Sequence, residues 1–147
     1  GMAARSGRAA RRAAREAAIQ LLYCWEVGGR SLDEALEGFR QSGVRTLDEA
    51  TGELAQALAR GTAACLDRID PLLDAQAQHW RLERMGVVDR WILRLGAYEL
   101  LETDTPRAVV INEAVELART FSTEDAVRFV NGVLDGLARV LAPPPSG

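Results

Sequence analysis

The side chains best suited to bind a ligand are arginines close to the N-terminus. The first 15 residues contain no acidic residue and five arginines: Arg5, Arg8, Arg11, Arg12 and Arg15. The last four follow a spacing of three and four residues, which places them on one face of a helix. Guanidinium groups hold phosphates through paired hydrogen bonds. This cationic row (Arg8, Arg11, Arg12, Arg15) therefore predicts a nucleic-acid partner.

Local stability explains the cationic row poorly. An exposed cation near a helix N-terminus is unfavourable by about 0.3–1 kcal/mol, whereas a bound phosphate is favourable there. The remaining 13 arginines share residues 16–147 with all 21 acidic residues, and the net charge is −3. A basic arm on an acidic body is typical of a polyanion-binding protein. The simpler alternative is a solvated, disordered basic tail.

Other reactive side chains do not form a catalytic or metal-binding pattern. Cys24 and Cys65 lie far apart without a CxxC motif, and we expect them to be small core residues. His79, the single histidine, has no neighbour at metal-ligand spacing. Glu113 and Glu116 resemble helix-surface residues more than an acid/base pair, because no histidine or glycine-rich turn accompanies them. We expect no enzyme activity, no metal and no cofactor.

Arg90, Arg94 and Phe129 each have two interpretations, and Gly132 has one. Arg90 and Arg94 would extend the basic surface, but adjacent acidic residues favour a solvated or partner-facing stripe. Phe129 is a core residue by default; at the surface it would stack on an unpaired base. Gly132 interrupts a predicted helix, which indicates close approach of a neighbouring helix.

Apolar residues recur every three or four positions along the chain, which predicts helices throughout. Start signals are Ser6, the capping boxes at Ser31 and Thr46, and Asp70 followed by a proline. Gly28-Gly29 and Asp104-Thr105-Pro106 are stop signals. The predicted helices cover about residues 7–27, 31–41, 46–66, 70–79, 87–101, 108–121 and 123–142.

The composition agrees with an all-α single domain of about seven helices. The chain has 147 residues, of which 48% are hydrophobic and 5% aromatic, and alanine and leucine dominate. We expect a flexible segment at 1–7, with Gly1 a cloning remnant, a helical domain at 8–142 and a proline-rich tail at 143–147. Neither a secretion signal nor an uncharged run of about 18 apolar residues is present, so we expect a cytoplasmic protein.

Four segments, in order, resemble the NusB family over nearly the whole chain. They are Arg11 to Tyr23, Leu93 to Leu100, Pro106 with Val110 to Ala118, and Phe129 to Asp135. The segment from Gly28 to about Arg84 is similar only in its helical pattern. The resemblance implies two packed helical sub-bundles.

The resemblance also implies a function. Members of the family bind the boxA element of nascent RNA together with ribosomal protein NusE, and they join RNA polymerase and other Nus factors to suppress premature termination, notably in ribosomal RNA operons. By position, the RNA side comprises Arg11, Arg12, Arg15, Tyr23, Asp125, Arg128 and Phe129. Asp89 aligns with an acidic position that faces NusE. Lysines common in the family are arginine or absent here, and the resemblance leaves homodimer formation open.

Two other functions remain open at this point. NusB-like helical domains also precede the catalytic domain of ribosomal RNA cytosine methyltransferases. The second alternative is a protein-interaction module whose basic arm is incidental. Comparing the binding of boxA RNA with that of scrambled RNA separates this alternative from a boxA-binding protein.

Overall fold

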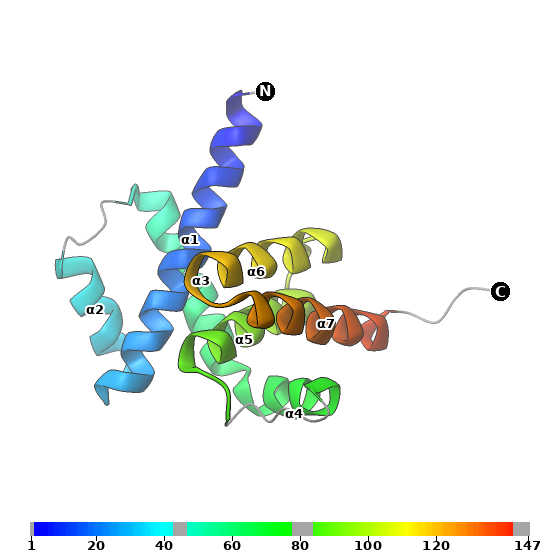
Figure 1. Cartoon of the computed structure of the whole chain (residues 1–147). Coiled ribbons are helices and arrows are strands. Elements are labelled where there is room, and N and C mark those ends of the chain that lie inside the picture. Colours follow the sequence, from blue (N-terminus) through cyan, green and yellow to red (C-terminus); the bar gives the residue numbers. More distant parts are fainter. Residues whose placement is uncertain (1, 43–46, 78–83, 143–147) are drawn as a thin grey trace. The chain divides into compact units, whose positions relative to one another are not determined.

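The computed structural model describes residues 2–42, 47–77 and 84–142, and within these ranges every regular element is an α-helix (Figure 1). The helices are α1 (Met2–Gly28), α2 (Leu32–Ser42), α3 (Glu49–Ala64), α4 (Leu66–Ala77), α5 (Val87–Glu102), α6 (Arg107–Phe121) and α7 (Glu124–Leu141). They form two compact units, Gly1–Ala64 and Cys65–Gly147. The all-α prediction, with its two sub-bundles, is confirmed.

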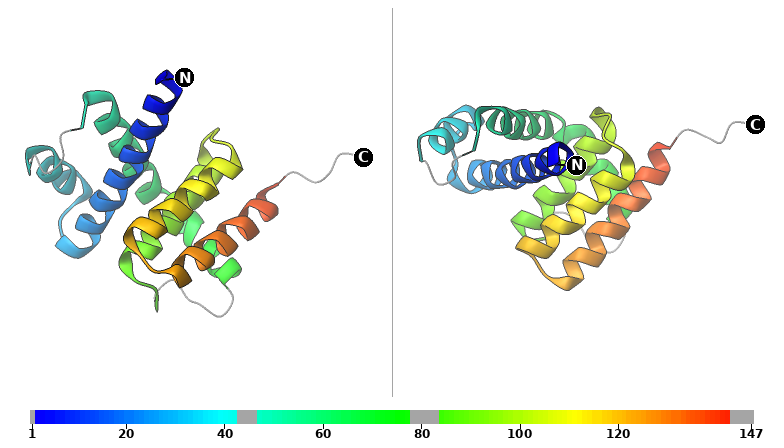
Figure 2. Two further views of the ribbon diagram at one scale, coloured as in Figure 1. Left: turned by 45° about the horizontal axis from the view of Figure 1, so that its top comes forward. Right: turned by 90° about the horizontal axis from the view of Figure 1, so that it is seen from above.

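In the first unit, α1 packs against α2 and runs alongside α3 (Figure 2). Alanines at positions 14, 17 and 18 are fully buried on α1, and so are Ala55 and Ala59 on α3. Because alanine side chains are short, the two helix backbones can approach closely. Leu21 and Leu22 complete the buried face of α1. The C-terminal half of α1 is therefore held in place by its packing within the first unit.

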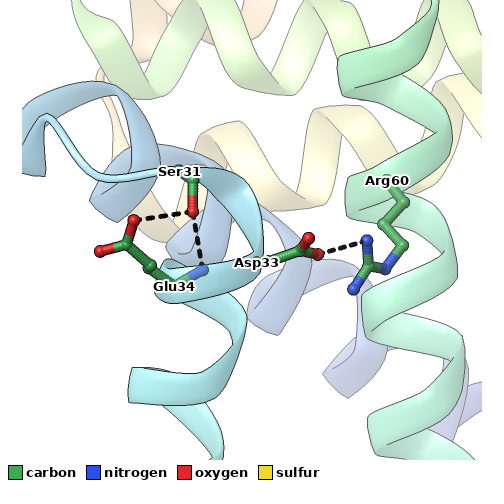
Figure 3. Close-up of polar contacts among 4 residues, drawn as sticks. All are labelled: Ser31, Asp33, Glu34 and Arg60. Atoms are coloured by element: carbon green, nitrogen blue, oxygen red, sulfur yellow. Dashed lines mark hydrogen bonds and ion pairs between the residues drawn. The ribbon is translucent and has the colours of Figure 1, made fainter.

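The first unit confirms two predicted helix ends. Gly29 has a φ of 67°, in the left-handed region that favours glycine, and α1 ends beside it. The Ser31 hydroxyl oxygen accepts a hydrogen bond from the Glu34 backbone N–H at 3.1 Å and donates to the Glu34 carboxylate at 3.0 Å (Figure 3). An ion pair of 2.8 Å between Asp33 and Arg60 links α2 to α3. Because both side chains of this pair are exposed, it adds little to stability.

The predicted start of α3 is wrong by about three residues. Thr46 lies outside the described residues, and α3 begins at Glu49. The cap is Asp48, whose carboxylate accepts a hydrogen bond from the Thr51 backbone N–H at 2.7 Å. This backbone hydrogen bond lowers the pKa of Asp48, since it stabilises the charged carboxylate.

The second unit is built around α5, which packs against α4, α6 and α7. Trp91, Ile92, Leu93 and Leu95 on α5 are all buried. In both views of Figure 2, α6 and α7 run side by side in opposite directions. This antiparallel pair follows from the sharp turn at Ser122 and Thr123, where the two helices join.

At two glycines of the second unit, an added Cβ would meet a side chain of a neighbouring helix. A Cβ at Gly96 of α5 would lie 2.7 Å from a Leu134 methyl on α7, and a Cβ at Gly136 of α7 would clash with the Gln76 side chain of α4. Real Cβ atoms almost never come so close. Glycine at position 96 leaves room for the fully buried Leu134 side chain, whereas at position 136 the neighbouring atom is the end of the flexible Gln76 side chain.

The expected start of α4 is wrong. The helix begins at Leu66 rather than Asp70, because the Cys65 carbonyl already accepts hydrogen bonds from the Arg68 and Ile69 N–H groups. Pro71 therefore lies inside the helix instead of at its first position. His79, at the predicted end of this helix, lies outside the described residues.

The remaining boundaries follow the prediction closely, with differences at the chain ends. The Thr123 hydroxyl caps α7 by accepting from the Ala126 N–H at 3.1 Å. Helix α1 begins at Met2, so Ser6 does not cap it. The separate segment at 1–7 and the tail at 143–147 stay predictions, and the tail lies outside the described residues. Cys24 is exposed, so its assignment to the core is wrong, and Cys65 is half-buried.

Replacing Asp48 with alanine should lower the free energy of unfolding, because the Thr51 N–H loses its acceptor. The lowered pKa means that the stabilisation is present above the ordinary pKa of 3.8 and is lost as pH falls through the folded-state value. Urea unfolding at neutral pH and at about pH 3 measures both effects. Asp48→Asn keeps an acceptor but does not titrate, so its stability should change less with acid; an acid response equal to wild type would contradict the assignment.

Candidate nucleic-acid interface

The cationic row on α1 passes from solvent into the core. Arg8, Arg11 and Arg12 are exposed, whereas Arg15 is only 5% exposed. Ile19, further along the same face, is 2% exposed. The change occurs within about two helical turns, as the change from arginine to apolar residues predicts. The exposed part of the row is therefore three arginines, and Arg15 lies where the row enters the packed region.

The exposed end of α1 is uniformly positive. Its first turn contains no acidic residue, and the first acidic residue of the chain is Glu16. Helix N-termini carry unpaired N–H groups and a partial positive charge, which add to the field of the arginines. An anionic strand is the partner that this combination favours.

Tyr23 lies further along α1 and is 41% exposed. It follows Arg12 by 11 residues, about 16 Å along the axis and within about 20° around it. The ring is thus on the same side of the helix as the Arg12 guanidinium. An exposed aromatic ring beside a cationic strip is typical of surfaces on which bases stack.

The second unit carries the other predicted RNA-side residues at the start of α7. Asp125 and Arg128 form an exposed ion pair of 2.5 Å, with 89% and 77% of their side chains accessible. Phe129 is half-buried, so it is neither the fully buried core residue nor the fully exposed stacking residue that the sequence allows. We call these three residues the α7 surface. The cap at Thr123 fixes the helix turn from which they project.

Gly132 does not serve the purpose that the sequence suggested. It is exposed, and a Cβ added to it would meet nothing within 4 Å. The close helix contacts occur instead at Gly96 and Gly136. Within a helix, glycine is less stable than alanine by about 1 kcal/mol. The packing of the described chain gives no reason for this cost at Gly132.

Asp89 lies in the first turn of α5 and is half-buried. Its Oδ1 atom is inaccessible to solvent and has no hydrogen-bond partner among the described residues. A carboxylate oxygen in this condition is costly unless a donor reaches it. Because solvent does not reach Oδ1, a partner at this surface would contact only the accessible part of the half-buried Asp89 side chain.

Arg90 and Arg94 are neither a basic surface nor a solvated stripe. Arg94 donates two hydrogen bonds of 2.9 Å to the two carboxylate oxygens of Asp70, joining α5 to α4. Its guanidinium also lies 4.6 Å from the centre of the Trp91 ring. Arg90 donates to the Met85 carbonyl at 2.8 Å. Both arginines therefore stabilise the second unit.

No described helix is both long enough and apolar enough to cross a membrane. No group of three or more histidine, cysteine or acidic side chains within the described ranges is arranged to hold a metal ion.

These features define a class: a helical protein of two units with a cationic first helix suited to nucleic acid. Sequence comparison identifies the family within this class, since a profile of the NusB family matches residues 12–139. The chain belongs to the NusB family. It is 40% identical to the transcription antitermination protein NusB of Solibacter usitatus, over 92% of this chain and 93% of that one. Identity to the Streptomyces griseus NusB protein is 48%, over 86% and 90%.

Solved structures agree with this membership. T. maritima NusB is similar with a TM-score of 0.79 and 38% identity, covering 90% of this chain and 93% of that one. A structure of antitermination factors NusB and NusE in complex with double-stranded RNA is similar with a TM-score of 0.76 and 28% identity, covering 89% and 97%. The fold of the described helices is therefore the fold of the family.

Replacing Arg94 with alanine should lower the free energy of unfolding by about 2 kcal/mol, because Asp70 loses two charge-assisted hydrogen bonds. Urea unfolding measures this loss. In a double variant that also contains Asp70→Ala, the two losses should not add. RNA affinity that falls in Arg94→Ala without a loss of stability would instead return Arg94 to the basic surface.

Proposed function

We propose that this chain is a transcription antitermination factor that binds the boxA element of nascent RNA together with ribosomal protein NusE. The observation that carries the proposal is the exposed cationic end of α1, formed by Arg8, Arg11 and Arg12. Family membership supports it, and so does the similarity to a NusB–NusE structure that contains RNA. The names of the relatives favour this function over a part of a methyltransferase.

The α1 end attracts RNA through its phosphates. Each guanidinium that neutralises a phosphate releases counterions, so affinity depends on salt and little on sequence. Arg15 stays a predicted RNA-side residue by resemblance, but its burial leaves direct phosphate contact to the three exposed arginines. Tyr23 supplies a ring on which a base of the same strand stacks.

The α7 surface reads bases. Bases of single-stranded RNA can be splayed from one another and stacked on aromatic rings, which a duplex does not permit. Phe129 offers part of its ring, while Arg128 and Asp125 offer a donor and an acceptor at its side. The α1 arginines thus supply attraction, and the α7 surface supplies discrimination between sequences.

NusE binds through a face that includes Asp89, and the complex joins RNA polymerase with other Nus factors in the bacterial cytoplasm. The accessible part of the half-buried Asp89 side chain accepts a hydrogen bond from NusE in this assignment. The role is one of binding, and it requires no catalytic group, metal or cofactor.

Titration with a single-stranded boxA oligonucleotide, a scrambled one and a boxA duplex tests the function. We expect tightest binding to single-stranded boxA, and tighter binding when NusE is present. In the triple variant Arg8→Ala, Arg11→Ala, Arg12→Ala, the slope of log affinity against log salt should become shallower by about 2. Each lost phosphate contact accounts for about 0.7 of this change. Circular dichroism should show unchanged helix content.

A matched variant removes three exposed arginines elsewhere: Arg30→Ala, Arg40→Ala and Arg84→Ala. It changes the net charge equally and should keep most of the salt slope. Equal binding to boxA and scrambled RNA would refute the antitermination function, while equal slopes in the two triple variants would refute the role of the α1 end. A preference for the duplex would contradict single-strand reading.

Replacing Asp89 with alanine should weaken NusE binding and leave RNA binding by the chain alone unchanged. The reason is that the donor on NusE loses a charged acceptor, a loss of about 1.5–3 kcal/mol. Calorimetric titration with NusE measures it, and Asp135→Ala on α7 serves as a control. Normal NusE affinity in Asp89→Ala would remove Asp89 from the partner face.

A further inference from the structure

Among the residues that the structure describes, none packs against Gly132 in a way that requires glycine there. Gly132 does not have a positive φ; among the described glycines, Gly29 does. Its Cβ would meet no atom within 4 Å, unlike those of Gly96 and Gly136. Alanine would fit at Gly132 and would make α7 more stable. A residue that lowers stability without a packing role indicates a requirement imposed from outside the fold.

The place of Gly132 on α7 suggests what that requirement is. It follows Phe129 by three residues and Arg128 by four, so it lies one turn further along the same face. Helical side chains point toward the N-terminus of their helix. A side chain at 132 would therefore extend over the turn that presents Phe129 and Arg128, and glycine leaves that turn uncovered.

We propose that Gly132 is the floor of a base-binding position: an unpaired RNA base packs flat on the α7 backbone at Gly132, with its edge against Phe129. The proposal rests on the RNA-binding function proposed above. It adds that Gly132 selects a flat base through the shape of the surface. The exposed ion pair of Asp125 and Arg128 borders this position and offers polar atoms to the edge of the base. A nucleobase suits the position because its face is flat and apolar while its edge is polar.

Gly132→Ala tests the proposal, with Gly52→Ala on α3 as the matched control. A Cβ at Gly52 likewise meets nothing within 4 Å, so both substitutions should raise the midpoint of thermal unfolding. We expect Gly132→Ala to weaken binding of single-stranded boxA RNA by about fivefold or more, the lower end of what one base stack contributes. Gly52→Ala should bind as wild type does.

The salt slope separates this effect from that of the arginines. A steric obstruction lowers affinity equally at all salt concentrations, so Gly132→Ala should keep the wild-type slope. Gly132→Leu should bind more weakly still, because it covers more of the Phe129 turn.

Three results would overturn the inference or its basis, and they are distinguishable. If wild type binds boxA RNA and Gly132→Ala binds equally well, the glycine has no role in RNA binding. If Gly132→Ala binds RNA normally but loses NusE, the surface serves a protein and the base position is wrong. If wild type itself does not distinguish boxA from scrambled RNA, the proposed function fails.

Discussion

The division of α1 into a packed half and an exposed half is the constraint on which the rest of the first unit depends. Ala14, Ala17 and Ala18 bring α1 close to its neighbours, and α2 and α3 then cover the leucines beyond them. Arginines cannot replace these alanines without burying charge, which is costly unless each charge is paired. The cationic end is therefore exposed because the apolar half is anchored.

The second unit shows how differently the same residue type can act. Arg94 is used inside the fold, where Asp70 and the Trp91 ring hold it between two helices. Arg128, on the surface of α7, pairs with Asp125 while most of both side chains stays accessible. An exposed pair of this kind contributes little to stability, about 0–1 kcal/mol. Arg128 can therefore exchange its partner for a ligand, whereas Arg94 cannot do so without loosening α4 from α5.

Two places in the chain oppose the local rules of helix stability. Arginines gather along the exposed part of α1, where like charges three and four residues apart repel one another. Glycine occupies an exposed position in the interior of α7, where alanine would be more stable. Natural chains follow these rules nearly everywhere and depart from them at functional sites. Both departures fall on the surfaces assigned to RNA, which gives the two assignments a common physical basis.

The sequence alone determined what depends on residues close together in the chain. Three- and four-residue spacing predicted the helices, and hydrogen bonds within one turn predicted the cap at Ser31 and the end of α1 at Gly29. The change from arginine to apolar residues along α1 likewise predicted which end is exposed.

Only the tertiary structure decided what depends on contacts between distant residues. It buried Arg15, joined Arg94 to Asp70, and placed the close helix contacts at Gly96 and Gly136 rather than Gly132. Periodicity gives the face of a helix on which a residue lies, but not what packs against that face. That depends on how the other helices fill the space, because packing is a property of the assembled unit and not of any one segment.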